Sequence, residues 1–462
     1  MPQLNKTFIY FICCVSAMGG LLFGYDWVVI GGAKPFYEAF FGIGGDPAMQ
    51  GLAMSIAIAG CLVGAMVAGF FADLWGRRPL LLLSAIVFLV SAYMTGAVDT
   101  FIPFLLARLI GGVAIGVASG MSPMYIAEVS PSETRGRMVS INQLTIVLGI
   151  LGAQIVNWLI AEPMPVGLEI PPLDSWNCQM GWRWMFWAEA FPAAAFLLLV
   201  MFIPESPRWL ILKGKPDQAK KVFARIGGNE YAKVEIEAIK TAEEAQEHTH
   251  GLSTLLKKPN ISLIILGVII AVFQQWCGTN VIFNYAQEIF SNAGYDLGEM
   301  LFNIVLTGVT NVVFTFVALY AVDRIGRKIL MLIGSGGLFA IYLILGSCYY
   351  FQVSGILMVI LVMLAIACYA MTLGPVTWVL LAEIFPNKVR GIAMAVCTFA
   401  LWTGCFTLTY SFPLLNASLG SYGTFWLYSA ICISGFLYFS RKLPETKGKT
   451  LEQIEKELLK QR

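Results

Sequence analysis

Residues 73–79 read DLWGRRP and residues 323–329 read DRIGRKI. Both contain Asp-x-x-Gly-Arg followed by a second cation, with a glycine that permits a tight turn. Two further phrases recur in the same order: AEVSPSETRG at 127–136 matches AEIFPNKVRG at 382–391, and PESPRWL at 204–210 matches PETKGKTL at 444–451. These repeats predict that the chain consists of two similar halves.

The segments between the repeats are strongly apolar. The chain of 462 residues is 58% hydrophobic and 13% charged, with a mean hydropathy of +0.74. About 20 apolar residues allow a helix to cross a bilayer. Such windows lie near 8–33, 50–71, 79–98, 101–126, 136–160 and 183–203, and near 261–290, 298–320, 328–350, 356–383, 389–414 and 420–440. The sequence therefore predicts an all-α membrane protein with twelve transmembrane helices in two six-helix bundles.

Positive charges predict the orientation of these helices. Twelve spans place both chain ends on one side. Every Lys and Arg except Lys34, Arg108 and Arg183 falls in a terminus, a loop or the linker on that side. Cytoplasmic loops carry an excess of Lys and Arg, so both termini are expected in the cytoplasm. The predicted domains are a bundle at 1–203, cytoplasmic linker helices at 204–260, a bundle at 261–440 and a cytoplasmic tail at 441–462. The first apolar run is too long for a cleavable signal peptide and is predicted to be the first span.

The composition offers little support for an enzyme or a metal protein. Most of the 10 cysteines lie inside spans, where a thiol behaves as a small apolar group. The only histidines, His248 and His250, lie in the linker; they either bind a metal or form a solvated loop pair, and the loop is favoured. The linker runs 216–226 and 232–247 are amphipathic and predict surface helices. No cofactor or metal is expected, because the cysteines show no metal-ligand spacing. No nucleic-acid partner is expected, because the cations cluster beside spans, which fits topology rather than phosphate binding.

Further motifs accompany the repeats: GYD at 24–26, SPMYIAE at 122–128, QQWCGTN at 274–280 and GPVTWVLLAEIFP at 374–386. With this ordered set the chain resembles the sugar porter family of the major facilitator superfamily over almost its whole length, and in particular the bacterial proton-coupled monosaccharide symporters. The resemblance implies two six-helix bundles and proton-driven import of a monosaccharide by alternating access across a bacterial inner membrane. It also implies monosaccharide, protons and lipid bilayer as partners, and a monomer is expected.

Asp26 and Arg108 are ionisable residues within apolar spans. Each is expected about seven residues, or ~10 Å, from the outer end of its helix, and therefore at similar depth in one bundle. Charged groups at such depth face the protein interior and pair. The pair is either structural or a proton switch. Proton-coupled members of the family carry Asp at this place, which favours proton coupling over two rivals, a uniporter with a structural Asp26 and a transporter-like sugar sensor.

A sugar site needs amides that donate and accept hydrogen bonds, together with aromatic rings. Polar amides within the spans, at positions where the resemblance implies sugar ligands, are Gln143, Gln274, Gln275, Asn280, Asn284 and Asn311, with Tyr369 and Trp378 as aromatic candidates. On a straight helix Gln275 and Asn280 would point ~140° apart. A break at Gly278 is therefore predicted, and Gly374–Pro375 is expected to loosen the tenth span. Alternatively, a single amide can simply join helices, which is our interpretation of Asn157.

Some positions depart from the pattern of the family. Asn284 stands where the family commonly has the first of two tyrosines, and Leu401 stands where relatives carry Gln or Asn. The neighbouring Trp402 would then form an apolar wall. Ile150 and Phe283 resemble the residues of glucose-carrying members, which favours an aldohexose such as D-glucose and leaves D-xylose open.

The repeated loops predict a charge network at the cytoplasmic face. Its arginines are expected to pair with glutamates at helix ends, and such a network would hold the halves together and release when that face opens. Alternatively, the charges are topological anchors. The expected members are Asp73, Arg77, Glu128, Arg135, Glu205 and Arg208 in the first half, and Asp323, Arg327, Glu383, Arg390 and Glu445 in the second.

Overall fold

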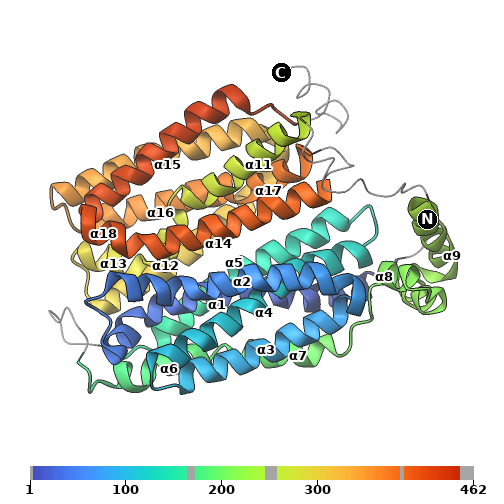
Figure 1. The fold of residues 1–462 in the computed structure, drawn as a ribbon, viewed down its shortest axis with the longest axis horizontal. Helices are drawn as coiled ribbons and strands as arrows, with labels where there is room; N and C mark the ends of the chain where they lie inside the picture. Colours follow the sequence, from blue (N-terminus) through green and yellow to red (C-terminus); the bar gives the residue numbers. More distant parts are fainter. Residues whose placement is uncertain (1–3, 164–171, 245–257, 386–389, 448–462) are drawn as a thin grey trace. The chain divides into compact units, whose positions relative to one another are not determined.

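The computed structural model describes residues 4–163, 172–244, 258–385 and 390–447, and within these ranges the regular structure is helical (Figure 1). The first half contains α1 (Lys6–Phe41), α2 (Pro47–Trp75), α3 (Arg77–Ala97), α4 (Phe101–Val129), α5 (Arg135–Ile160), the π-helix η1 (Asn177–Gly181), α6 (Trp182–Trp187) and α7 (Ala190–Val200). The linker contains α8 (Pro207–Leu212) and α9 (Pro216–Glu244). The second half contains α11 (Lys258–Trp276), α12 (Thr279–Asn284), α13 (Ala286–Asn292), α14 (Leu297–Ile325), α15 (Arg327–Tyr350), α16 (Ile356–Met371), α17 (Leu373–Glu383) and α18 (Arg390–Lys442).

The described part of the chain contains 11 helical segments that are long and apolar enough to cross a membrane. The last of them, Ile392–Lys442, has 51 residues, far more than the ~20 that one crossing needs. Its backbone leaves the helical conformation at Gly420, where φ is 68°. This segment therefore accounts for the eleventh and twelfth predicted spans, and the predicted all-α membrane fold is confirmed.

The contacts of the chain group it into two compact units. Unit 1 comprises Met1–Val29, Ile56–Val156 and Trp182–Thr249, and unit 2 comprises Ile30–Ser55, Asn157–Gly181 and His250–Arg462. The first part of α1 therefore belongs to unit 1, and the rest of α1 packs with the C-terminal half of the chain. The bounds of these units differ from those of the predicted bundles at 1–203 and 261–440, which stay a prediction from the repeated sequence.

The two repeated Gly-Arg turns have the same backbone geometry. Gly76 separates α2 from α3 with φ of 97°, and Gly326 separates α14 from α15 with φ of 108°. A residue with a Cβ atom is strained at such angles. Each glycine thus lets one long helix end and the next begin within a single residue, which places an arginine at the first position of α3 and of α15.

Close packing in unit 1 depends on glycines of α4. A Cβ atom at Gly112 would collide with the backbone of Ala57 on α2, and one at Gly116 would collide with the backbone of Cys61. Small residues let helix backbones approach closely where apolar lipid removes the hydrophobic drive for association. The α2–α4 contact is therefore made by the backbones themselves.

Two membrane helices of unit 2 are broken. Gly278, with φ of 88°, lies between α11 and α12, as the sequence predicts. The tenth predicted span is broken at Thr372, whose φ and ψ of −124° and −86° separate α16 from α17. This break comes two residues before the expected Gly374–Pro375. Pro375 lies in the first turn of α17, where a missing N–H group costs no hydrogen bond.

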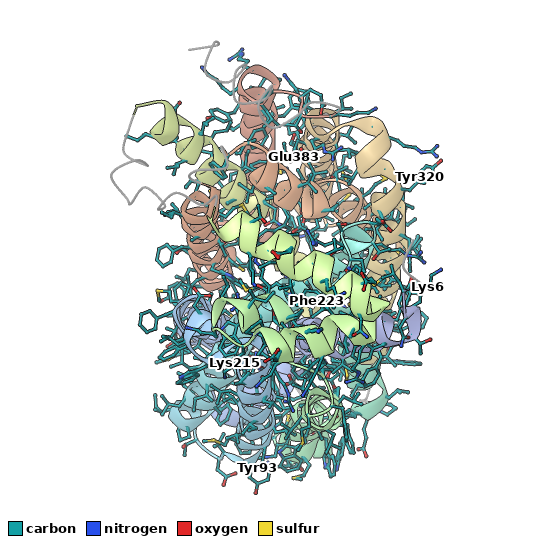
Figure 2. All side chains as sticks on the ribbon, turned by 90° about the vertical axis from the view of Figure 1, so that its right-hand side faces the viewer. Lys6, Tyr93, Lys215, Phe223, Tyr320 and Glu383 are labelled. Carbon is teal, nitrogen blue, oxygen red and sulfur yellow. The ribbon has the colours of Figure 1, made fainter. Side chains whose placement is uncertain are left out.

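The linker forms the helices that its amphipathic pattern predicts. In α9, Gly227 and Gly228 leave the helical conformation and divide the element into two pieces. Figure 2, seen from the right-hand side of Figure 1, shows α9 at the front with Phe223 labelled. Phe223 is buried and packs edge-on against Tyr231. The predicted metal or loop pair, His248 and His250, lies outside the described residues.

Candidate functional site

Asp26 on α1 and Arg108 on α4 form a buried ion pair within unit 1. Their side chains are in direct contact through Asp26 Oδ1 and an Arg108 terminal nitrogen, and the other terminal nitrogen donates to the Asp26 carbonyl oxygen over 3.4 Å. Asp26 is only 3% exposed and Arg108 2%. The guanidinium also lies 5.3 Å from the ring centroid of Phe186. Removal of either partner would leave the other charge buried without its counter-ion.

A second carboxyl group, Glu189, lies beside this pair. It is fully buried at the start of α7 and interacts electrostatically with both Asp26 and Arg108. Sequence reasoning missed Glu189, although an acidic residue within the apolar run WAEAF was a usable signal. One guanidinium therefore interacts electrostatically with two carboxyl groups in an environment that disfavours net charge.

Four polar side chains of unit 2 form a hydrogen-bonded chain. Asn280 on α12 donates its amide to Gln275 Oε1, and Gln275 donates to Gln274 Oε1 over 2.6 Å. Gln274 in turn donates to the hydroxyl of Tyr369 on α16. Because Gly278 breaks the helix between them, Gln275 and Asn280 meet despite a spacing that would separate them on a straight helix. We call these four side chains the amide chain.

The other predicted sugar residues are distributed as follows. In unit 1, Gln143 is exposed on α5 and Ile150, two turns further along, is buried. In unit 2, Trp378 on α17 is 40% exposed. The remaining members are buried in the same unit: Phe283, Asn284, Asn311 and Trp402.

The charged loop of unit 1 is built on Arg77, the first residue of α3. One terminal nitrogen lies 2.9 Å from Glu128 Oε1 on α4, and the other lies 3.4 Å from Asp73. Glu205 accepts the backbone N–H groups of Arg77 and Arg78, and so satisfies donors that the start of a helix leaves open. Burial raises the pKa of Glu205, and these N–H bonds oppose the rise.

Unit 2 repeats this arrangement. Arg327, the first residue of α15, lies 3.1 Å from Glu383 Oε1 on α17. Glu445 accepts the backbone N–H groups of Arg327 and Lys328 over 2.9 and 3.1 Å. Thr446 adds a hydrogen bond to the second oxygen of Glu383 over 2.6 Å. The duplication seen in sequence is thus also a duplication of hydrogen-bond geometry.

The remaining members of the predicted network are less informative. Arg135 and Arg208 are exposed in unit 1. The side chains of Asp323 and Arg390 lie outside the described part of the chain. Each arginine–glutamate pair that the structure describes lies within one unit.

Two further buried cations have acidic partners that the sequence did not reveal. Lys34 contacts Glu38 on its own helix and Glu288 on α13. Arg183 lies 2.7 Å from Asp99, and it also donates to backbone carbonyl groups at the end of α3. Lys34, Arg183 and Arg108 are the three cations that the predicted topology does not place on the cytoplasmic side.

The fold and these sites define a class of protein. Long apolar helices that bury ion pairs and amides within the membrane-spanning segments are typical of proteins that move polar solutes or ions, and this chain is a multi-pass membrane transporter. A family model described as "Sugar (and other) transporter" matches residues 12–458, and the chain belongs to this family.

Several relatives match this chain over nearly its full length. The chain is 34% identical to the D-xylose-proton symporter of Escherichia coli K12, with 98% of this chain and 96% of the relative covered. It is 32% identical to the glucose facilitated diffusion protein of Zymomonas mobilis, with 96% of each covered. The inward open structure of the E. coli xylose transporter XylE matches with a TM-score of 0.85 at 33% identity, covering 97% of this chain and 99% of that one.

Proposed function

We propose that this protein is a proton-coupled monosaccharide importer that works by alternating access. The observation that carries the proposal is the buried Asp26–Arg108 ion pair, with the buried Glu189 interacting electrostatically with both residues. The family membership and the similarity to a D-xylose-proton symporter support the same assignment.

The cluster is suited to hold one exchangeable proton. With both carboxyl groups ionised, it carries one excess negative charge, and burial makes that charge costly. Binding of one proton makes the cluster neutral. A proton on Asp26 would also release Arg108 to other partners and so change which helix packing is preferred in unit 1.

Coupling follows from this switch without an additional step. If the protonated state is the state that binds sugar more tightly, then bound sugar raises proton affinity by the same free energy. A sugar bound from the proton-rich side is therefore carried with a proton. The loops rich in Lys and Arg, together with both termini, are assigned to the cytoplasm, so the opposite face is the proton-rich outer side.

The sugar ligands proposed in unit 2 are centred on the amide chain, because amides both donate to and accept from hydroxyl groups. Phe283, Trp378 and Trp402 supply apolar surface suited to the carbon face of a sugar ring. Gln143 and Ile150 are the proposed contributions of unit 1. Leu401 offers no hydrogen bond, so the site has one polar ligand fewer than the family pattern.

The proposed substrate is an aldohexose such as D-glucose or the pentose D-xylose. The apolar residues Ile150 and Phe283 favour a hexose, whereas the relative compared above is named for D-xylose. Competition by a panel of unlabelled monosaccharides against labelled glucose and xylose decides between them.

A facilitated carrier is the second candidate, because a relative of similar identity is named a glucose facilitated diffusion protein. In that case Asp26 and Arg108 would only hold α1 against α4. The test adds sugar to de-energised membrane vesicles and records external pH. Alkalinisation on adding sugar is expected for the symporter, and sugar uptake without any alkalinisation would establish the facilitated carrier.

A further inference from the structure

The amide chain has a direction. Each amide nitrogen donates to the next acceptor, in the order Asn280, Gln275, Gln274 and Tyr369. The side-chain oxygens of Gln275 and Gln274 are thereby used as acceptors within the chain. At one end Asn280 retains its carbonyl oxygen, and at the other end the Tyr369 hydroxyl retains its proton.

Burial distinguishes the middle of the amide chain from its ends. Gln274 is 5% exposed and Gln275 is 6% exposed, whereas Asn280 and Tyr369 are both partly exposed. The two ends of the amide chain are therefore less buried than its middle. One end offers an acceptor and the other a donor.

The Tyr369 ring is held by the break between α16 and α17. The N–H group of Thr372 donates to the Tyr369 carbonyl oxygen over 3.1 Å and closes the turn. The backbone of Gly374 lies beside the ring, where a Cβ atom would come within 3.4 Å of it. This turn positions the hydroxyl at the Gln274 amide, on a helix that is otherwise remote in sequence.

We propose that Tyr369 is a positioning and specificity residue: its hydroxyl fixes the direction of the amide chain, and so presents a donor at Tyr369 and an acceptor at Asn280 to two different sugar hydroxyl groups. The inference rests on the proposed function and deepens it. Without the hydroxyl, the buried amide of Gln274 has no acceptor at that end, and its orientation is no longer determined.

The direction has a consequence for substrate selection. A sugar hydroxyl at the Tyr369 end accepts a hydrogen bond, and one at the Asn280 end donates one. If the chain loses its direction, amide rotation exchanges donors and acceptors along it. The protein then loses discrimination at the ring position that Tyr369 reads before it loses binding altogether.

The experiment measures dissociation constants by calorimetry on purified full-length protein. The ligands are D-glucose, D-xylose and the monodeoxy forms of the better of these two sugars. The variants are Tyr369→Phe, Gln274→Met and the double variant. Tyr349→Phe is the matched control, because its hydroxyl donates to the Ile289 carbonyl oxygen over 2.7 Å, away from the amide chain.

Tyr369→Phe is expected to weaken binding of the parent sugar about three- to tenfold, the loss of one hydrogen bond. It should also remove the penalty of one monodeoxy analogue. Gln274→Met is expected to remove the same penalty, and the double variant should differ from Gln274→Met by no more than about twofold. Tyr349→Phe should keep the wild-type profile.

Two outcomes overturn the inference while leaving the proposed function intact. One is an unchanged deoxy-sugar profile in Tyr369→Phe, and the other is a double variant in which the two losses multiply. If Tyr369→Phe does not fold, Gln274→Met decides, because an unchanged profile there has the same meaning. A wild-type protein that binds no monosaccharide overturns the proposed function itself, and the inference with it.

Discussion

Lys34 forms a buried ion pair with Glu288, although the two residues are 254 positions apart in the chain. The ammonium group also lies 3.0 Å from Glu38 and 5.6 Å from the ring centroid of Tyr285. Lys34 is 2% exposed. A single cation thus holds two carboxylates together in unit 2 and joins the end of α1 to α13.

Lys34→Met should destabilise the protein, because it leaves the buried Glu38 and the partly buried Glu288 without a cation. Breaking a buried pair in this way costs about 3–5 kcal/mol, which a melting curve in detergent detects as a lower transition temperature. Lys233→Met is the control, since its pair with Glu230 is exposed. Adding Glu38→Gln and Glu288→Gln to Lys34→Met should restore part of the loss; an unshifted transition for Lys34→Met alone contradicts the prediction.

Asp26→Asn should abolish uphill accumulation of sugar while preserving exchange of sugar at equal pH. The asparagine cannot take up a proton, so the proton gradient no longer drives transport. Accumulation and counterflow are measured in the same membrane vesicles. Asp99→Asn is the control, because Asp99 is exposed and pairs with Arg183 at the end of α3. Wild-type accumulation by Asp26→Asn would refute proton coupling at this site.

Glu189→Gln should make uptake less dependent on the proton gradient. With one carboxyl group removed, Asp26 and Arg108 form a neutral pair without a bound proton, so fewer sugars are carried with a proton. The measurement is proton uptake per sugar in de-energised vesicles, compared with the wild type. An unchanged ratio would exclude Glu189 from the proton-binding cluster.

Gln275→Ala should weaken sugar binding about ten- to a hundredfold, because it interrupts the amide chain and leaves buried neighbours without partners. Trp378→Ala should also weaken binding, through the loss of apolar surface. Equilibrium binding to purified protein measures both. Thr310→Ala on α14, whose hydroxyl donates to the Leu306 carbonyl oxygen, should bind normally. Near-normal affinity in both site variants would refute the sugar assignment in unit 2.

Gly76→Ala should lower stability, since alanine at a φ of 97° is strained by about 1–2 kcal/mol and its Cβ atom would collide with Glu205. Gly326→Ala should act in the same way through Glu445. Gly120→Ala is the matched control, because a Cβ atom there meets open space. Thermal transitions of the three variants test this; equal transitions for Gly76→Ala and Gly120→Ala would contradict it.

Much of the architecture was accessible from the sequence because the membrane imposes strict local rules. A helix must be apolar over the hydrocarbon thickness, and its loops reveal its direction through Lys and Arg. The break at Gly278 was predictable too, since two amides five residues apart share a site only if the helix is interrupted. The break at Thr372 was predicted two residues late, because glycine and proline allow a break over several neighbouring positions.

Partners distant in the chain were less accessible. Asp26 and Arg108 could be matched, since topology placed them at similar depth. No sequence pattern indicates which residues pair with Glu189, Glu38 and Glu288. The solvent exposure of Gln143 and Trp378 could likewise not be predicted from their residue types. Such features depend on how helices rotate and pack, and many rotations satisfy the same apolar pattern.

The sequence by itself determined the class of protein, the duplication, the number of apolar segments and the identity of the acid in the first span. Only the tertiary structure decided that a second buried carboxyl group, Glu189, interacts with the Asp26–Arg108 pair, that Lys34 reaches Glu288 and that the amide chain ends at Tyr369. The physical reason is the distance along the chain over which each interaction acts. Hydropathy and turn chemistry act within one helix, whereas a buried charge or amide is satisfied by whichever distant side chain the packing brings to it.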